Sequence, residues 1–312
     1  MRSPTYSPTV RRRRLGMQLR RMRETVGLTV TEASGRSKIP RTTLGKIETA
    51  ETQKVQSGHL ERLVELYKVP HDEAEALRQL ARDAGDKGWW WRYRDVFGHG
   101  ALPDFETEAS LIKTYEVATI PGLLQTPEYA AGIFQAGNLT ASEHIVRQVE
   151  ARMRRREILH RHERPPQLWA VIDEAALRRP IGEPGVLTGQ LDYLTRIGQN
   201  ANIHIQVLPF SAGAYSGIGS PFTILEFPEP LDPTIVYTDT VTGGQFEEAP
   251  EDVEQYVVTF GNVQGSAAST VVSAQIIEGI REESTNGTET SVPKEQLQQP
   301  SAELRGGRRP AW

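Results

Sequence analysis

Hydrophobic residues recur every three or four positions through the first eighty residues, with charged residues between them. Leu15, Leu19 and Met22 follow this spacing, which predicts an amphipathic helix. Four further short helices are predicted before residue 82. Each has the same spacing or is preceded by helix-capping residues. Five short helices in succession indicate a compact all-α domain, which we place at residues 11–82.

The pattern changes beyond residue 88, where apolar and polar residues alternate as in Ile203, Ile205 and Val207. Such alternation predicts strands, and four are expected, at residues 167–173, 202–208, 222–227 and 234–239. Helices are expected near residues 104–118, 127–136, 140–163, 187–197, 250–263 and 266–282. Because several strands follow one another without an intervening helix, we expect an α+β domain with a mixed sheet over residues 89–282.

The two ends of the chain lack this periodicity. Residues 1–10 are rich in proline, serine and threonine, and residues 283–312 show no hydrophobic repeat, so both segments are predicted to be disordered. The fold class expected from the sequence is therefore multidomain, with an all-α five-helix domain followed by an α+β domain.

Charge is divided unevenly between the two predicted domains. Residues 1–82 carry 17 Lys and Arg against 9 Asp and Glu, a net charge of +8, whereas the remainder carries 19 against 31, a net charge of -12. A basic segment attracts a polyanion such as DNA by releasing counterions, and an acidic one is repelled. The charge favours a nucleic-acid partner for the N-terminal domain, although a merely solvated basic surface would show the same bias.

The chain contains no cysteine, which excludes disulfides, thiolate metal sites and a cysteine nucleophile and is typical of the reducing cytoplasm. Charged residues interrupt the segment after Arg14, so no signal peptide is expected, and no apolar run has the length of a membrane span. Motifs of phosphate-binding loops, serine hydrolases and zinc proteases are absent. We expect a cytoplasmic protein that is not an enzyme and that needs no cofactor, metal or membrane.

Two short helices joined by a tight turn are predicted at residues 29–48. Thr29 and Glu32 have the spacing of a capping box at the start of the first helix, and Pro40 suits the first turn of the second. The seam between the helices is expected to contain four apolar residues, Ala33, Ile39, Leu44 and Ile47. A helix-turn-helix of this kind inserts its second helix, here about residues 40–48, into the major groove of DNA.

Polar side chains on this second helix are the predicted base readers. Arg41 can form a bidentate contact with guanine, and Lys46 can reach a base or the backbone. Thr42 and Thr43 can meet a thymine methyl group or a phosphate. Phosphate contacts are predicted for basic residues near the turn and in the N-terminal run, namely Arg36, Lys38, Arg11, Arg12, Arg13 and Arg14. Since one short helix reads few base pairs, we expect a homodimer on two half-sites of double-stranded DNA.

This segment resembles the phage-repressor-like (XRE-type) helix-turn-helix family, through the residues Gly27-Leu28-Thr29, Glu32, Ile39 and Arg41–Glu48. The resemblance implies DNA binding with Arg41–Glu48 as the recognition helix. Val30 stands where the family often has a phosphate-binding Gln, and Pro40 replaces a Ser or Thr cap. Lys38 replaces the usual turn glycine, at a place where a positive φ would strain the backbone. A helical domain that keeps the fold but binds protein is the alternative.

Several blocks of the C-terminal two-thirds resemble a domain of unknown function that in actinobacteria is usually fused to this kind of helix-turn-helix. The blocks are WWWRYRDVFG (89–98), TIPGLLQTPEYA (119–130), VEARMRRREIL (149–159), IDEAAL (172–177) and QVLPF (206–210). Those fusions are described as antitoxin-like transcriptional regulators, often encoded beside a small partner protein. The resemblance implies a regulatory domain for dimerisation, for an effector or for a partner protein.

Two other functions are open alternatives: an antitoxin-like protein that mainly sequesters a small partner protein, and a C-terminal domain that senses or acts on a small molecule. Trp89–Trp91 could stack on a base or a ligand, but three adjacent large rings more often serve packing. Asp173 and Glu174 directly follow a predicted strand, where an acid–base pair could lie, yet no partner histidine or metal motif accompanies them.

Overall fold

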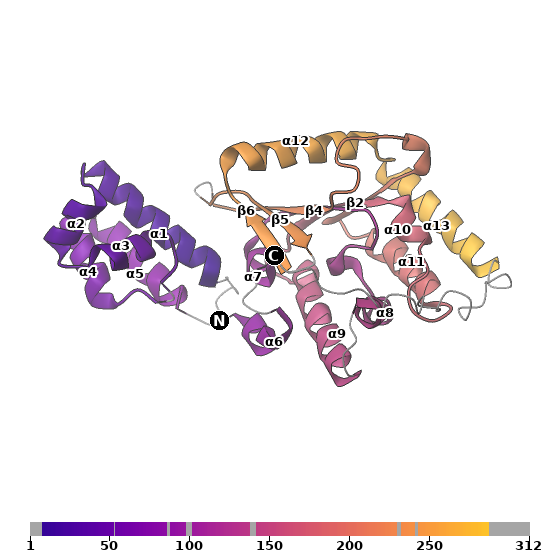
Figure 1. Cartoon of the computed structure of the whole chain (residues 1–312), viewed down its shortest axis with the longest axis horizontal. Coiled ribbons are helices and arrows are strands. Elements are labelled where there is room, and N and C mark those ends of the chain that lie inside the picture. Colours follow the sequence, from indigo (N-terminus) through magenta and orange to yellow (C-terminus); the bar gives the residue numbers. More distant parts are fainter. Residues whose placement is uncertain are drawn as a thin grey trace, which may run out of the picture.

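The structure, a computed structural model, describes residues 8–52, 54–85, 88–97, 102–137, 142–229, 232–240 and 243–286. Figure 1 shows a helical N-terminal domain beside a larger domain in which helices surround a β-sheet. The sheet contains both parallel and antiparallel strand pairs. The predicted fold class, an all-α domain followed by an α+β domain with a mixed sheet, is confirmed.

Five helices form the N-terminal domain: α1 (Pro8–Thr25), α2 (Val30–Ser37), α3 (Arg41–Glu48), α4 (Ser57–Leu66) and α5 (His71–Asp83). The predicted capping box is present, because the Thr29 hydroxyl accepts a hydrogen bond from the Glu32 amide (3.2 Å) and the Glu32 carboxylate accepts one from the Thr29 amide (2.9 Å). Lys38, between α2 and α3, has a left-handed backbone with φ at 54°, so a non-glycine residue does occupy the strained turn position.

The core of this domain is built from the apolar faces of its helices. The four residues predicted to form the seam are at most 2% exposed, and they are Ala33, Ile39, Leu44 and Ile47. Leu15 and Leu19 of α1 lie in the same cluster and are at most 1% exposed. The helix-turn-helix is therefore held against α1 by a continuous apolar contact.

A mixed sheet organises the second domain. Its strands are β1 (Leu111–Glu116), β2 (Gln167–Asp173), β3 (Ile203–Leu208), β4 (Phe222–Glu226), β5 (Ile235–Thr240) and β6 (Gly243–Glu247). They lie side by side in the order β3-β2-β1-β4-β5-β6. The first three are parallel to one another, and β4, β5 and β6 continue the sheet in antiparallel pairs. Strand β1 thus lies where the parallel and antiparallel halves meet.

Helices cover both faces of this sheet (Figure 1). On one face α12 (Pro250–Ser266) packs on the sheet, with Phe260 in one cluster with Tyr115 of β1. The other face carries α8 (Pro127–Gly137), α9 (Ser142–Arg156), α11 (Val186–Ile197) and α13 (Thr270–Asn286). Shorter helices complete the domain: η1 (Trp89–Tyr93), α6 (Arg94–Phe97), α7 (Leu102–Glu108), η2 (Gly122–Leu124), η3 (Glu157–His160), α10 (Glu174–Arg178) and η4 (Phe210–Ala212).

The prediction of a helix over residues 104–118 is wrong in its second half. Helix α7 ends at Glu108, and β1 follows as an inner strand of the sheet. The strand carries polar residues on a buried face, where the Thr114 hydroxyl hydrogen-bonds the Thr223 hydroxyl (3.1 Å), so the apolar alternation is broken. Strand β6 was not predicted either, because its glycines and polar residues lack the apolar signal of a strand.

Two chain boundaries differ from the expected ones. Helix α1 begins at Pro8, and Val10 is 3% exposed because it packs into the core of the second domain. Helix α13 continues to Asn286. Residues 1–7 and 287–312, where disorder was predicted, lie outside the described residues, as does the expected helix start at Thr140.

Gly16 allows α1 to pass close to the end of α3. A methyl group at Gly16 would lie 2.6 Å from the carbonyl oxygen of Ile47 and 2.7 Å from that of Glu48, and backbone atoms cannot rotate away. Gly16→Ala is therefore expected to lower the free energy of unfolding by roughly 1–3 kcal/mol, as overpacked sites do. The midpoint of urea unfolding, followed by circular dichroism, measures this change.

Gly35→Ala is the matched control, because Gly35 lies within α2 and a methyl group there meets no atom within 4 Å. It should be neutral or stabilising, since alanine favours a helix over glycine by about 1 kcal/mol. Equal midpoints for Gly16→Ala and the unmodified chain would contradict the close approach of α1 and α3.

Candidate nucleic-acid interface

The polar face of α3 is open to solvent and carries the predicted base readers. Arg41, Thr42 and Lys46 are exposed, and Thr43 is partly buried. Within the described residues, neither Arg41 nor Lys46 has a carboxylate within ion-pair distance. Two cations and two hydroxyls thus lie together on one short helix, and neither cation is paired with an acidic neighbour among the described residues.

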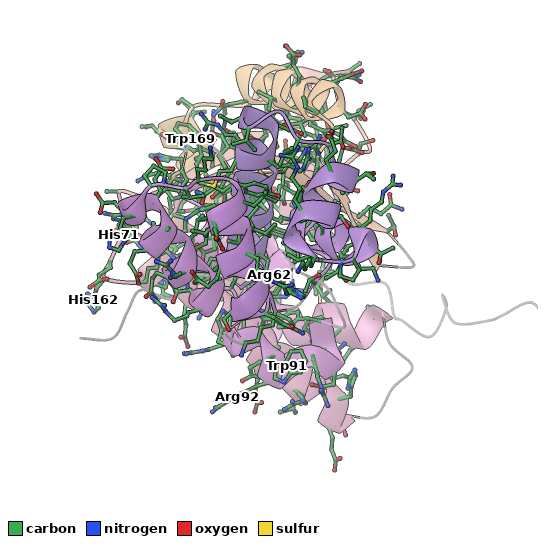
Figure 2. The ribbon with its side chains drawn as sticks, turned by 90° about the vertical axis from the view of Figure 1, so that its left-hand side faces the viewer. Arg62, His71, Trp91, Arg92, His162 and Trp169 are labelled. Carbon is green, nitrogen blue, oxygen red and sulfur yellow. The ribbon has the colours of Figure 1, made fainter. Side chains whose placement is uncertain are left out.

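The turn before α3 adds further positive charge. Arg36 at the end of α2 and Lys38 in the turn are both exposed. Arg62 of α4 lies next to them, since its guanidinium donates to the carbonyl oxygen of Lys38 (3.3 Å) and to that of Gly58 (2.9 Å). Figure 2, which views the molecule from the side of the helical domain, shows Arg62 facing the viewer. Sequence analysis missed Arg62, because the contact joins positions 24 residues apart that no local pattern connects.

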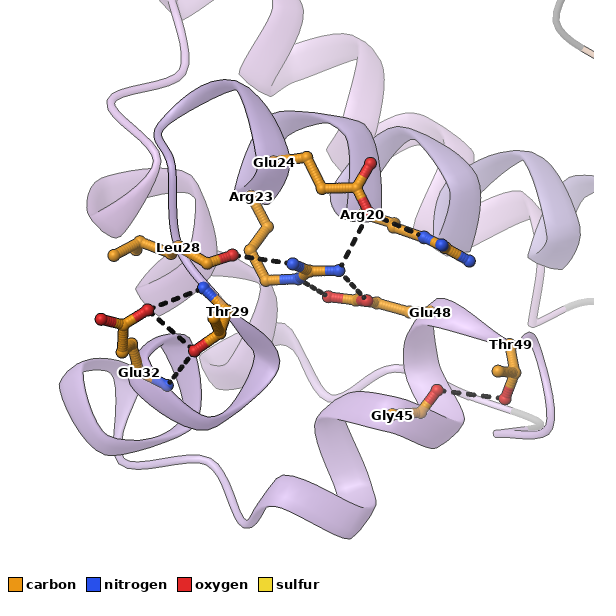
Figure 3. Close-up of polar contacts among 9 residues, drawn as sticks. All are labelled: Arg20, Arg23, Glu24, Leu28, Thr29, Glu32, Gly45, Glu48 and Thr49. Atoms are coloured by element: carbon orange, nitrogen blue, oxygen red, sulfur yellow. Dashed lines mark hydrogen bonds and ion pairs between the residues drawn. The ribbon is translucent and has the colours of Figure 1, made fainter.

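A buried ion pair holds the far end of α3 (Figure 3). The Arg23 guanidinium of α1 donates to both carboxylate oxygens of Glu48, the last residue of α3, at 2.8 and 2.9 Å. A third bond runs from Arg23 to the carbonyl oxygen of Leu28 (2.7 Å). The two charged side chains are only 7% and 5% exposed. Hydrogen bonding to Glu48 raises the pKa of Arg23 above its usual value.

The ion pair and the capping box act on different ends of the motif. Thr29 and Glu32 fix the start of α2, whereas Arg23 and Glu48 fix the end of α3. Glu48 was identified from the sequence only as a family-like residue, and Arg23 was one of several arginines in a basic helix. The pair is a functional support of α3 that sequence analysis did not assign.

The structure places the four N-terminal arginines that were predicted to contact phosphates beside carboxylates. These are Asp83 for Arg11 (3.3 Å), Asp104 near the half-buried Arg12, Glu248 for Arg13 and Asp232 for Arg14 (3.1 Å). Three of these acids belong to the second domain. The Arg13 guanidinium also lies over the Phe105 ring, 4.8 Å from its centroid. The structure therefore does not bring this run together with the polar face of α3.

Trp89, the first residue of the tryptophan cluster, is a packing element in this structure. Trp89 contacts Tyr93 and Phe97 edge to face, with ring centroids 6.2 and 6.0 Å apart. Its indole N–H donates to the Thr107 hydroxyl (3.2 Å). These contacts join η1 and α6 to α7, so they support the packing interpretation over a stacking platform.

Asp173 and Glu174 are likewise occupied by structural contacts. The Asp173 carboxylate accepts from the Ala175 amide (2.9 Å), which caps α10, and from the Tyr215 hydroxyl (2.8 Å). Glu174 pairs with Arg178 (2.7 Å). Within the described part of the chain, no cluster of three or more histidine and acidic side chains could hold a metal ion. No described helix is long and apolar enough to cross a membrane.

Two known domain families match the chain. Residues 14–77 match a helix-turn-helix domain, and residues 100–279 match a domain of unknown function (DUF5753). The first range contains α2, α3 and the turn between them, and the second contains the whole sheet. Neither the curated proteins nor the solved structures that were searched include a significant match. The helix-turn-helix domain indicates a DNA-binding regulator rather than an enzyme.

Replacing Arg23 should test how the recognition surface is supported. Arg23→Met leaves Glu48 as a buried charge without its partner, and breaking a buried pair in this way costs about 3–5 kcal/mol. We expect the helical domain to unfold at a clearly lower urea concentration, as followed by circular dichroism.

Arg20→Met is the control from the same helix. Arg20 and Glu24 form an ion pair that is 63% and 53% exposed, and such pairs contribute no more than about 1 kcal/mol. If both variants shift the midpoint equally, the Arg23–Glu48 pair is not a special support of α3.

Proposed function

The chain belongs to the family of the domain of unknown function DUF5753, and because a helix-turn-helix domain precedes that domain we propose that it is a sequence-specific, cytoplasmic transcriptional regulator. The observation that carries the proposal is that the polar face of α3 is exposed. The other face of the same helix is buried, and Arg23 binds its last residue, Glu48. A rigid helix with free donors is what reading base edges requires.

In the proposed complex α3 lies in the major groove of double-stranded DNA. Arg41, in the first turn of the helix, donates to the O6 and N7 atoms of a guanine. Thr42 and Thr43 meet a thymine methyl group or a phosphate, and Lys46 reaches a base or the backbone one turn later. These four residues determine which sequence is bound.

Phosphate contacts come from the residues around the turn. Arg36 and Lys38 are exposed there, and the Arg62 side chain supports the turn from α4. We leave Arg11–Arg14 out of the proposed interface, because their side chains face acidic groups at the junction with the second domain. The proposed interface is therefore confined to the turn and to α3.

We further propose that the regulator acts as a homodimer, so that two copies of α3 read two half-sites about 34 Å apart. The second domain then provides dimerisation, effector binding or the binding of a small partner protein, as in the antitoxin-like regulators that it resembles. Its acidic net charge keeps it away from the DNA backbone.

Arg41→Ala tests the proposed base contact. We expect the affinity for the preferred DNA to fall by on the order of 1–3 kcal/mol, with loss of preference at one base pair only. Gel-shift titrations on DNA from upstream of the protein's own gene, on single-base variants of it and on a scrambled duplex measure both effects. Equal affinity of the unmodified chain for the native and the scrambled duplex would refute sequence-specific binding.

Two companion variants separate the possible causes of a weaker complex. Arg36→Ala removes a proposed phosphate contact, so it should weaken binding to every duplex alike and reduce the salt dependence of log K by about one unit. Arg82→Ala removes an exposed arginine of α5 that is outside the proposed interface and should change little. A uniform loss for Arg41→Ala would make Arg41 a phosphate contact instead.

A further inference from the structure

A cavity of about 670 Å³ lies at the carboxyl end of β1, between the sheet, α9 and the segment after β1. Its volume is within the range of pockets that hold small molecules. It lies at the boundary between the parallel and the antiparallel strands, since β1 has β2 on one side and β4 on the other. Open sheets often bind ligands beyond the carboxyl ends of their strands.

Much of the cavity lining is apolar and aromatic, and it includes Phe97, Leu102, Ile133, Phe134, Phe222 and Phe246. The lining also contains polar residues, among them two guanidinium groups from α9, those of Arg152 and Arg155. A mostly apolar lining with a few polar groups suits a molecule with an apolar body and a polar head. Whether the cavity can bind a negatively charged head group depends on whether the two arginines already have counterions within the protein.

Arg155 has its counterion within the protein. Its guanidinium donates to both carboxylate oxygens of Glu106 in α7, one of them at 2.6 Å, and Glu106 is 1% exposed. The Arg155–Glu106 pair is therefore a closed ionic contact in the wall of the cavity.

Arg152 has no such counterion, since no described carboxylate lies within 4.0 Å of it. Its guanidinium lies over the Phe134 ring (5.1 Å to the centroid) and donates to the side-chain oxygen of Gln125 (3.0 Å). Gly122 makes room for it, because a methyl group at Gly122 would lie 2.6 Å from Nη1. Burial, together with the charge of Arg155, lowers the pKa of Arg152 to about 10, because these two effects outweigh the attraction of the more distant carboxylates of Glu106, Asp239 and Glu116.

We propose that this cavity binds a small organic anion, with its carboxylate on Arg152 and an apolar body against the aromatic wall. A planar guanidinium recognises a carboxylate through two parallel N–H donors, and a buried cation is stabilised when an anion reaches it. The site lies entirely within the second domain and does not depend on DNA binding.

Glu116 makes the affinity of this site depend on pH. Its side chain lines the cavity, and burial raises its pKa to about 7. The charged and titratable groups that act on it are Asp239 of β5, Arg152 and Arg155 of α9 and Tyr129 of α8. Above neutral pH the ionised Glu116 repels a bound anion, and below it the protonated form does not. Anion affinity should therefore rise as the pH falls through about 7.

The test uses the full chain and the fluorescent probe anilinonaphthalene sulfonate, which combines an anionic group with aromatic rings. We expect one saturable site that phenylacetate displaces and that phenylacetamide, its uncharged counterpart, does not. Arg152→Gln should weaken probe binding by about 10-fold or more, whereas Arg154→Gln, which removes an exposed arginine two positions later on α9, should leave it unchanged.

Repeating the titration at about pH 6 and about pH 8 should show tighter binding at the lower pH, and Glu116→Gln should abolish the difference. Equal binding by the Arg152→Gln and Arg154→Gln variants would overturn the proposal. So would equal displacement by phenylacetate and phenylacetamide, or no displacement by phenylacetate. The comparison of these two compounds needs only the unmodified chain, so it decides the question even if Arg152→Gln does not fold.

Discussion

The buried ion pair between Arg23 and Glu48 is the contact on which the geometry of the helix-turn-helix depends. Each charged group has lost most of its hydration, which is replaced by the other group and, for Arg23, also by the Leu28 carbonyl oxygen (2.7 Å) and the Glu24 carboxylate (3.4 Å). An arrangement in which α3 slides or rotates on α1 would break the two hydrogen bonds between Arg23 and Glu48 and leave Glu48 buried without its partner. The pair therefore selects one orientation of α3, whereas the apolar seam would tolerate several. Gly16 completes this constraint by letting the two backbones approach each other.

Helix α1 binds α3 near one of its ends and contacts the second domain at the other, so it links the two domains. Val10 is part of the core of the second domain, and Arg13 lies over the ring of Phe105 in α7. The neighbouring residue Glu106 is the counterion of Arg155 in the wall of the cavity. Described contacts thus run without a break from the cavity through α7 and α1 to the recognition helix. A ligand that displaced the Arg155–Glu106 pair would act on a helix that α1 touches directly.

Local signals in the sequence predicted the parts of this structure that depend on nearby residues. The capping box at Thr29 and the left-handed turn at Lys38 involve residues within a few positions of each other. Strand β2 follows from its own apolar run. Strand β1 was not predicted, because its burial is decided by neighbours from distant parts of the chain, such as Thr223 opposite Thr114. The Arg23–Glu48 pair and the cavity were not predicted for the same reason, because both are formed by residues that are far apart in the sequence.

The basic run at Arg11–Arg14 shows that a count of charges along the sequence does not say which cations are left unpaired by the fold. The run contributes a third of the twelve Lys and Arg residues in positions 1–46, and those residues favoured a nucleic-acid partner. In the structure the run faces Asp83 and acids of the second domain, so its field is largely compensated at that junction. The positive field beside α3 arises instead from residues spread over α2, the turn, α3 and α4. The same basic segment thus forms a positive surface beside α3 and ion pairs at the start of α1. The difference arises because the fold, and not the local sequence, decides which cations lie beside an acid.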